Sequence, residues 1–315
     1  MSHDVTPPSV RYLHVSADRA GQRLDNFLLT HLKGVPRSWV YRVIRRGEVR
    51  VNKARTKPGQ ALAAGDQIRI PPVRRDVSSP QSPGKAWQQA ITRAILYEDA
   101  ELLVLNKPSG VAVHGGSGVN HGVIEILRSL HPRHADWELA HRLDRETSGC
   151  LLIAKKRAVL RQLHGLQQGR QMNKRYLALV SGRWSEPQCQ VDAPLRKNTL
   201  CSGERIVTVA ADGKSARTHF RMQRRVGRHT LIEARLETGR THQIRVHAAH
   251  MGTPVLGDEK YGELRHNQMA RQQGLKRLFL HAWQLRFRWP NASGYHHFTA
   301  PLASELQHFI DRQHG

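Results

Sequence analysis

A proline-rich segment in the first third of the chain limits how the rest can fold. Residues 71–92, PPVRRDVSSPQSPGKAWQQAIT, contain four prolines and few apolar side chains. Such a segment can bury little surface, so we predict a flexible linker over residues 73–92. Since 315 residues is long for a single core, two domains are expected. The small domain covers residues 21–72 and the larger domain covers residues 93–315. Residues 1–20 form an N-terminal extension that precedes the small domain.

The net charge indicates the kind of partner. Lysine and arginine total 50 against 25 acidic residues, which gives a formal charge of +25. This excess repels itself in a compact protein, so a polyanionic partner is its simplest explanation. A membrane surface would require a basic amphipathic helix or a lipid signal, and neither is found. No apolar run approaches the roughly 20 residues that span a bilayer. We expect a nucleic-acid partner and no membrane.

The cysteines and the N-terminus indicate the compartment. The segment MSHDVTPPSV lacks the apolar core of a secretory signal. Cys150, Cys189 and Cys201 are odd in number and form no C-x-x-C pair. A disulfide framework or a structural zinc site is therefore a poor interpretation, and a reducing cytoplasm is expected.

The histidines and one glycine-rich loop are candidates for metal or nucleotide binding. The chain has 20 histidines but no H-E-x-x-H motif. His247 and His250 lack an obvious third ligand, so we expect them at the surface or facing RNA, and no metal site. His114–Gly122, HGGSGVNHG, lacks both the P-loop and the dinucleotide pattern. It is interpreted as a flexible or substrate-contacting loop.

The small domain shows helical and strand patterns. Leu24, Phe27, Leu28 and Leu32 have helical spacing, and VPRSWVYRVIRRG predicts a second helix that ends before Gly47. Ser38 is a possible cap of this helix. Strands are predicted around VRV and at GDQIRI.

The same domain carries a one-sided charge run. Between Lys33 and Lys57 there are nine basic residues and one acid, Glu48. A solvated face is the simpler interpretation of such a run. The single sign and the aromatic residues Trp39 and Tyr41 favour a nucleic-acid footprint instead.

The R-L-D start and the G-x-V-x-V-N strand of this domain resemble the small RNA-binding domain named after ribosomal protein S-four, over about fifty residues. The resemblance implies RNA contacts along the second helix and the strand that follows. The candidate residues are Arg37, Ser38, Tyr41, Arg42, Arg45, Arg46, Arg50, Asn52 and Lys53.

The larger domain mixes strands and helices without a regular beta-alpha-beta rhythm, which favours an α+β fold. Strands are predicted over Leu102–Asn106, Cys150–Ala154, Tyr176–Val180, Thr218–Gln223 and Thr230–Leu236. Helices are predicted over Val123–Leu130, Ala158–Gln168 and His242–Met251. Thr241 is expected to cap the last helix, and Gly252 follows its end.

The segment LAHRLDRETSGC contains the most suggestive carboxylate, Asp144. One interpretation is a turn aspartate that bonds the backbone amides of Glu146 or Thr147, and spacing alone favours it. The other is a reactive group. Arg142 and Arg145 would lower the pKa of the neighbouring carboxyl and keep it ionised, which suits a nucleophile or an electrostatic stabiliser.

Three further segments carry polar groups at the ends of predicted elements. MNKRYLALV places Lys174 and Tyr176 at the entry of a strand, ETGRTHQIRVH delivers Arg245 at a helix start, and GDEKYGE is a turn with Tyr261. Taken singly, Tyr176 is most simply a half-buried strand aromatic, and Arg245 a cation on a helix surface.

Together the motifs H-R-L-D-x-x-T-S-G, K-x-Y-x-A and G-R-T-H-Q-I-R-V-H resemble the pseudouridine synthases that act on ribosomal large-subunit and transfer RNA. The resemblance covers essentially the whole chain. It implies a mixed, mostly antiparallel catalytic domain after the S-four-like domain, and a monomer without cofactor or metal. The implied reaction flips out a uridine of large-subunit ribosomal RNA, cleaves its N1–C1′ bond and rejoins the base through C5.

The resemblance also implies residue roles. Asp144 would be the essential catalytic residue, and Arg142 would occupy the space vacated by the flipped base. Tyr176 would stack on the base, with proton acceptance as a further role, and Arg245 would pair with Asp144. The other residues expected to bind the substrate are His141, Thr147, Lys174, Arg240 and His242.

Two alternatives belong to other functional classes. A non-catalytic RNA-binding assembly factor has little use for the intact set of Asp144, Tyr176 and Arg245. A base-excising glycosylase would release free uracil instead of forming an isomer.

Overall fold

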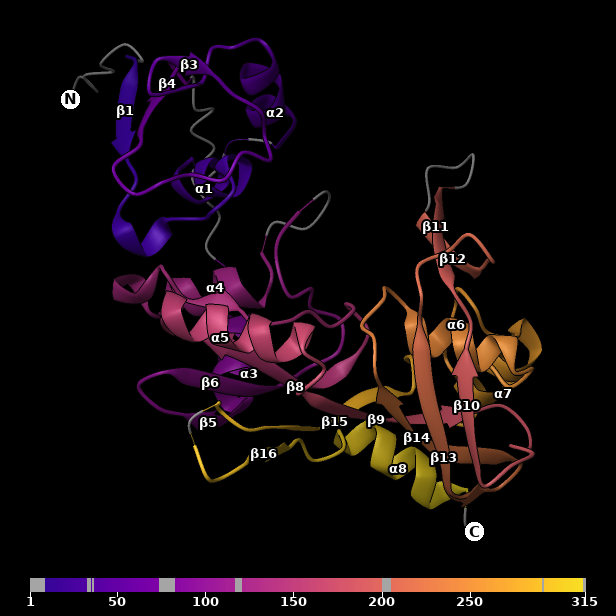
Figure 1. Ribbon diagram of the computed structural model, residues 1–315. Coiled ribbons are helices and arrows are strands. Elements are labelled where there is room, and N and C mark those ends of the chain that lie inside the picture. Colours follow the sequence, from indigo (N-terminus) through magenta and orange to yellow (C-terminus); the bar gives the residue numbers. More distant parts are fainter. Residues whose placement is uncertain are drawn as a thin grey trace, which may run out of the picture. The chain divides into compact units, whose positions relative to one another are not determined.

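The computed structural model describes residues 9–32, 35, 37–73, 83–116, 121–199, 205–290 and 292–313, without the side chains of residues 37, 38 and 205 (Figure 1). The chain divides into two compact units, Met1–Ser82 and Pro83–Gly315. Of the expected linker, residues 74–82 lie outside the described part. Residues 85–92 are not a linker, because they belong to helix α3 (Lys85–Arg93), whose Ile91 is buried in the core of the larger unit.

In the smaller unit two helices cover one face of a sheet. Helices α1 (Leu24–His31) and α2 (Arg37–Arg45) bury the predicted leucine and phenylalanine positions together with Val40, Val43 and Ile44. Ser38 lies inside α2 and so is not its cap. Gly47 follows the helix with a φ of 73°, a left-handed conformation that glycine adopts at little cost.

The sheet of the smaller unit has the antiparallel order β1-β4-β2-β3. Its strands are β1 (Arg11–His14), β4 (Gln67–Ile70), β2 (Arg50–Val51) and β3 (Ala54–Arg55). β1 comes from the expected N-terminal extension, which is therefore part of this unit. Asn52 and Lys53 join β2 to β3 with φ values of 49° and 68°, as a two-residue hairpin turn requires.

The larger unit is built on a ten-stranded sheet with the order β10-β13-β14-β9-β15-β8-β6-β5; β16 pairs with β15, and β7 with β8. The pairing of β15 with β8 is parallel and the others are antiparallel, so the predicted mixed, mostly antiparallel α+β fold is confirmed. The strands are β5 (Ile95–Glu98), β6 (Leu102–Lys107), β7 (Glu138–Leu139), β8 (Ser148–Ala154), β9 (Asn173–Val180), β10 (Gln188–Asp192), β13 (Arg217–Val226), β14 (His229–Leu236), β15 (Leu280–Phe287) and β16 (His296–Thr299). All five predicted strands and all three predicted helices of this unit are present.

Helices cover both faces of this sheet. Leu151 and Ile153 of β8 pack with α3 and α4 (Val123–Leu130), while Cys150, Leu152 and Ala154 pack with α5 (Arg157–Gln168). This two-sided burial explains why β8 is continuously apolar. The remaining elements are α6 (Gln243–His250), α7 (Leu264–Gln272), α8 (Ser304–Arg312), a hairpin of β11 (Leu195–Thr199) and β12 (Arg205–Val209), and the 3-10 turns Ala17–Arg19 and Pro132–His134.

The expectation that His247 lies at the surface is wrong. His247 is fully buried on α6, where its Nδ1 lies 2.9 Å from Thr218 Oγ1 and its Nε2 lies 3.0 Å from the carbonyl oxygen of Ala193. Both ring nitrogens are thus occupied by bonds to β13 and to the residue that follows β10. In the described part of the chain, no helix is long and apolar enough to cross a membrane.

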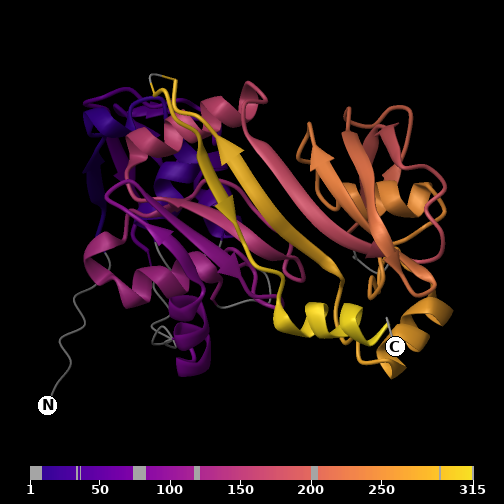
Figure 2. The same cartoon turned by 90° about the horizontal axis from the view of Figure 1, so that it is seen from below.

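Strand β15 joins the two halves of the sheet, as its golden ribbon between the magenta and orange strands shows (Figure 2). Its parallel pairing with β8 involves only His281 with Ser148 and Ala282 with Gly149. Gly149 has a φ of 108°, and a Cβ there would overlap the carbonyl oxygen of Ala282. Only glycine therefore permits this close approach.

Gly149→Ala should lower the free energy of unfolding of the larger unit by about 2–4 kcal/mol, from overpacking together with backbone strain. Gly165→Ala is the matched control, because Gly165 lies inside α5 with open space at its Cβ. It should raise stability by up to ~1 kcal/mol. Chemical denaturation of both full-length variants measures the difference, and equal stabilities would contradict the role of Gly149.

Candidate active site

A cavity of about 430 Å³ lies where three chain segments meet. They are the loop between β7 and β8, the start of β9, and the turn that leads from β14 into α6. Every residue predicted to be catalytic or to bind the substrate lines this cavity: Asp144, Tyr176, Arg245, His141, Arg142, Thr147, Lys174, Arg240 and His242. The structure thus brings together residues spread over about a hundred positions of sequence.

The loop that carries Asp144 is held from behind by a buried lysine. Lys107 is fully buried, and its Nζ donates hydrogen bonds to the carbonyl oxygens of Pro108, Val111 and Arg145 at 2.8, 2.8 and 3.0 Å. These bonds use all three donors of an ammonium group. Burial lowers the pKa of Lys107 to about 7. Gly110 and Arg145 add two reciprocal bonds, so the loop is fixed to the end of β6 and the turn that follows it.

The carboxylate of Asp144 faces the cavity without a hydrogen bond from any described residue. The turn around it is closed by its carbonyl oxygen, which accepts the N–H of Thr147 at 3.1 Å. The side-chain turn interpretation therefore does not hold. Two basic side chains lie close to it: Arg245, whose Nη1 lies 3.9 Å from Oδ2, and His242, whose Nε2 lies at the same distance. A carboxylate in this position is available to a substrate.

Arg245 has a stronger partner than the one expected. Its Nε and Nη2 donate to Oδ2 and Oδ1 of Asp258, both at 2.7 Å, and the Asp258 side chain is completely buried. Burial would lower the pKa of Arg245, but the bonds to Asp258 outweigh this and raise it. Pairing with Asp144 is thus the weaker contact, and Asp258 fixes the guanidinium in place. The motif GDEKYGE alone does not indicate this role for its aspartate.

Asp258 also shapes its own turn. Its Oδ1 accepts the N–H groups of Lys260 and Tyr261 at 2.9 and 3.0 Å. The ring of Tyr261 then lies 4.9 Å from the Arg245 guanidinium, in a cation–π contact. A single buried carboxylate therefore organises both the arginine and the tyrosine beside the cavity.

His242, not Thr241, is the N-cap of α6, so the expected cap is wrong. His242 has a φ of 56°, and its Nδ1 lies 2.7 Å from the hydroxyl of Tyr261. That hydroxyl accepts the N–H of Val207 at 3.0 Å, so its own proton is directed to Nδ1. Burial lowers the pKa of His242, although Asp144 opposes the shift. A neutral His242 then carries its proton on Nε2, which faces Asp144.

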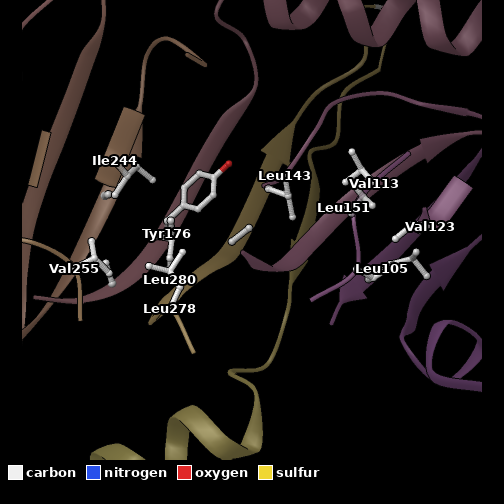
Figure 3. Close-up of a cluster of buried hydrophobic side chains, with 14 of the residues drawn as sticks. Leu105, Val113, Val123, Leu143, Leu151, Tyr176, Ile244, Val255, Leu278 and Leu280 are labelled. Carbon is white, nitrogen blue, oxygen red and sulfur yellow. The ribbon is translucent and has the colours of Figure 1, made fainter. Parts of the chain in front are cut away.

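Tyr176 forms the apolar wall of the cavity. Figure 3 shows its ring beside Ile244, with the hydroxyl directed away from Leu278 and Leu280. The residue is 7% exposed. Burial, and to a lesser extent Asp144, raises the pKa of Tyr176 above its ordinary value, so the phenol is protonated at neutral pH. A planar ring in this position suits stacking better than proton abstraction.

The sequence matches known families in both units. Residues 101–250 match the family of RNA pseudouridylate synthases, and residues 22–68 match the S4 domain. A ribosomal large subunit pseudouridine synthase C of Yersinia pestis is 52% identical over 305 residues, which cover 96% of this chain and 95% of the relative. Its counterpart in Escherichia coli K12 is 49% identical over 309 residues, 97% of each chain. This chain belongs to the RNA pseudouridine synthase family.

Solved structures agree with this membership. Human RNA pseudouridylate synthase domain containing 4 superimposes with a TM-score of 0.60 at 25% identity, covering 73% of the synthase described here and 96% of the human chain. Human RNA pseudouridylate synthase domain containing 1 gives a TM-score of 0.58, also at 25% identity, and covers 72% and 89%. The synthase is therefore an enzyme, an isomerase, with an N-terminal RNA-binding domain.

Burial lowers the pKa of two residues that are predicted to bind the substrate of the synthase, His141 and Lys174. The Nε2 of His141 accepts the N–H of Leu152 at 3.2 Å, and burial lowers the pKa of His141 to about 3. The ring is therefore neutral, with its proton on Nδ1. Lys174 donates to Gln167 Oε1 at 2.8 Å, and burial lowers the pKa of Lys174 to about 8. Arg142 and Arg240 are exposed at the rim.

The predicted RNA-binding residues differ in what their side chains do. The hydroxyl of Tyr41 donates to the buried Asp25 at 2.7 Å, and the amide of Asn52 bonds Asp66 and the N–H of Gln67. These two are thus engaged within the S4 domain. Exposed basic side chains are found at Arg42, Arg45, Arg46, Arg50 and Lys53. The side chains of Arg37 and Ser38 lie outside the described part of the structure.

Sequence reasoning missed the buried groups that hold the site. Gln243 is one of them: its Oε1 accepts from Thr238 Oγ1 and the N–H of Arg240, and its Nε2 donates to Thr218 Oγ1 and the carbonyl of Arg217. In the sequence, Gln243 and Asp258 are recognisable only as polar residues beside a helix cap and in a turn, which does not reveal their buried partners. Over the described residues, no group of three or more histidine, cysteine or acidic side chains could hold a metal ion.

Asp258→Asn should reduce both stability and synthase activity, because Arg245 would lose its buried partner. Removing one member of a buried ion pair costs about 3–5 kcal/mol. Glu259→Gln is the control: the adjacent Glu259 pairs with Arg271 at 2.9 Å but is 80% exposed. That change should stay within about 0.5 kcal/mol. Denaturant titrations measure the free energy of unfolding of both variants. If Glu259→Gln lost as much stability as Asp258→Asn, the role of Asp258 as the buried partner of Arg245 would be contradicted.

Proposed function

We propose that this synthase isomerises specific uridines of large-subunit ribosomal RNA to pseudouridine, with Asp144 acting at C1′ of the target nucleotide. The observation that carries the proposal is the carboxylate of Asp144, which faces the cavity between Arg245 and His242 and accepts no hydrogen bond from a described residue. The substrate class is inferred from the bacterial relatives, which are named ribosomal large subunit pseudouridine synthases. The +25 charge suits a polyanionic substrate.

The proposed binding step flips the uridine out of the RNA, at a cost of roughly a few kcal/mol. The cavity of about 430 Å³ lies within the size range of small-molecule sites. Tyr176 stacks on the flipped base, which is worth roughly 1–3 kcal/mol. Arg142, exposed at the rim, occupies the space that the base leaves. His141, Thr147, Lys174 and Arg240 complete the contacts.

In the proposed chemical step the Asp144 carboxylate stabilises or bonds the electron-poor C1′ centre as the N1–C1′ bond breaks, as in retaining glycosidases. The base then turns, C5 forms the new bond to C1′, and the C5 proton is lost while N1 gains one. Arg245 and the Nε2–H of His242 orient the carboxylate. The proposal includes a monomeric enzyme that acts on ribosomal RNA in the cytoplasm without cofactor or metal.

Asp144→Asn should abolish product while leaving RNA affinity within about twofold, because the substitution removes the charge but not the shape. Tritium release from RNA that carries 5-tritiated uridine measures the reaction, since the C5 hydrogen is lost. Glu146→Gln is the control, as Glu146 is half exposed two residues away. Full activity of Asp144→Asn would overturn the proposal. Free uracil as the product would favour a glycosylase.

Tyr261→Phe should lower kcat roughly 10- to 100-fold with KM nearly unchanged, because His242 would lose the bond that places its proton on Nε2. Tyr295→Phe is the matched control, since Tyr295 is 57% exposed and lies away from the cavity-lining residues. Its kcat and KM should equal those of the unmodified enzyme. A raised KM with an intact kcat in Tyr261→Phe would show that the tyrosine acts only in binding.

A further inference from the structure

The outer face of the S4-domain sheet carries a row of side chains that spans all four strands. Register places Tyr12 of β1 opposite Arg69 of β4, Arg69 opposite Arg50 of β2, and Arg50 opposite Arg55 of β3. Directly opposed residues lie on the same face of a sheet. The other face bears Ile68 and Val51, which are buried in the core. The row is therefore the solvent-facing side.

The three arginines of this row keep their charge uncompensated. Arg69 donates to the carbonyl of Glu48 at 2.8 Å, Arg50 to that of Lys53 at 3.1 Å, and Arg55 to that of Arg46 at 3.4 Å. Each guanidinium is thus held by a backbone oxygen. None of the three pairs with a carboxylate of a described residue. Like charges directly opposite one another in a sheet are unfavourable, so an anion that bridges them would relieve the repulsion.

Tyr12 gives this basic row an aromatic end. It is 56% exposed, although strand aromatics usually pack on a neighbour. Tyr12, Arg50, Lys53, Gln67 and Arg69 line a cavity of about 320 Å³. The cavity thus has an aromatic ring, three cations and an amide, and no acidic residue in its lining. Phosphates beside cations and a base on an aromatic ring are the combination that binds single-stranded nucleic acid.

We propose that this sheet face is a binding site for a single-stranded segment of the RNA substrate, with one base stacked on Tyr12 and the adjacent phosphates on Arg50, Lys53 and Arg69. Tyr12 lies before residues 22–68, which match the S4 domain, so the N-terminal strand adds the stacking residue to that domain's sheet. The site rests on the proposed function, because it assumes an RNA substrate. It extends that function by naming where unpaired RNA beyond the target uridine binds.

The test uses the full-length enzyme and a single-stranded oligoribonucleotide, with a duplex of the same length for comparison. Tyr12→Ala should weaken single-strand binding roughly 5- to 150-fold, the range of one stacked base. Tyr12→Phe keeps the ring and should retain the affinity. Tyr12→Ala should leave the salt dependence unchanged, because stacking releases no counterions.

Arg50→Gln and Arg11→Gln form a matched charge pair. Both remove one positive charge from the same sheet, but Arg11 is opposite the buried Ile70 and so belongs to the other face. Arg50→Gln should reduce the slope of log affinity against log salt by roughly 0.7, the value for one phosphate contact of a single strand. Arg11→Gln should leave the slope unchanged. Thermal unfolding of every variant confirms that it is folded.

Three outcomes would overturn the proposal. One is unchanged single-strand affinity in Tyr12→Ala, which would leave the face to another partner such as an acidic protein. The second is an equal loss of affinity for single strand and duplex in Tyr12→Ala, which would indicate that this face recognises the shape of RNA. The third is the same salt slope for Arg50→Gln and Arg11→Gln. Tritium release by the unmodified enzyme tests the proposed function separately, so either idea can fail without the other.

Discussion

The two-residue parallel pairing between β8 and β15 is the contact on which the catalytic unit depends. The Asp144 loop leads directly into β8, and Tyr176 lies on β9, which pairs with the opposite edge of β15. The distance between the carboxylate and the aromatic ring is thus set by one strand. Side chains reinforce the pairing: Ser148 Oγ lies 2.9 Å from His281 Nδ1 and accepts from Arg277 at 2.6 Å. Burial lowers the pKa of His281 to about 4, so this junction is held by neutral imidazole.

Around this junction the enzyme orders its polar groups with other buried polar groups. Lys107 holds the catalytic loop, Asp258 holds Arg245, and Gln243 holds the turn at Thr238–Arg240. A buried polar group costs little only when its partners are all present. Lys107, Asp258 and Gln243 each meet that condition, because their polar atoms all have hydrogen-bond partners. Preorganisation of the site thus depends on residues that are themselves buried.

The sequence predicted those features that depend on local pattern. The apolar run at Cys150–Ala154 and the helix at Val123–Leu130 are where their periodicity placed them, and the three motif segments meet in one cavity. What it could not supply were choices among long-range partners. Nothing local distinguishes Asp258 from Asp144 as the main partner of Arg245, or shows that His247 faces the sheet. The cap of α6 was misplaced because the left-handed φ of His242 serves its contact with Tyr261, and threonine is otherwise the better cap.

The pairing of β1 with β4 has a consequence for synthesis of the chain. The first strand, ending at His14, can pair only after Ile70, the end of the last strand, has been made. At ribosomal rates of about 5–20 residues per second, the first strand waits roughly 3–11 seconds for its partner. During that time β2 and β3 can form their hairpin from neighbouring residues, whereas β1 closes the longest loop of the unit and joins last. The aromatic edge of the sheet therefore appears only when the S4 domain is complete.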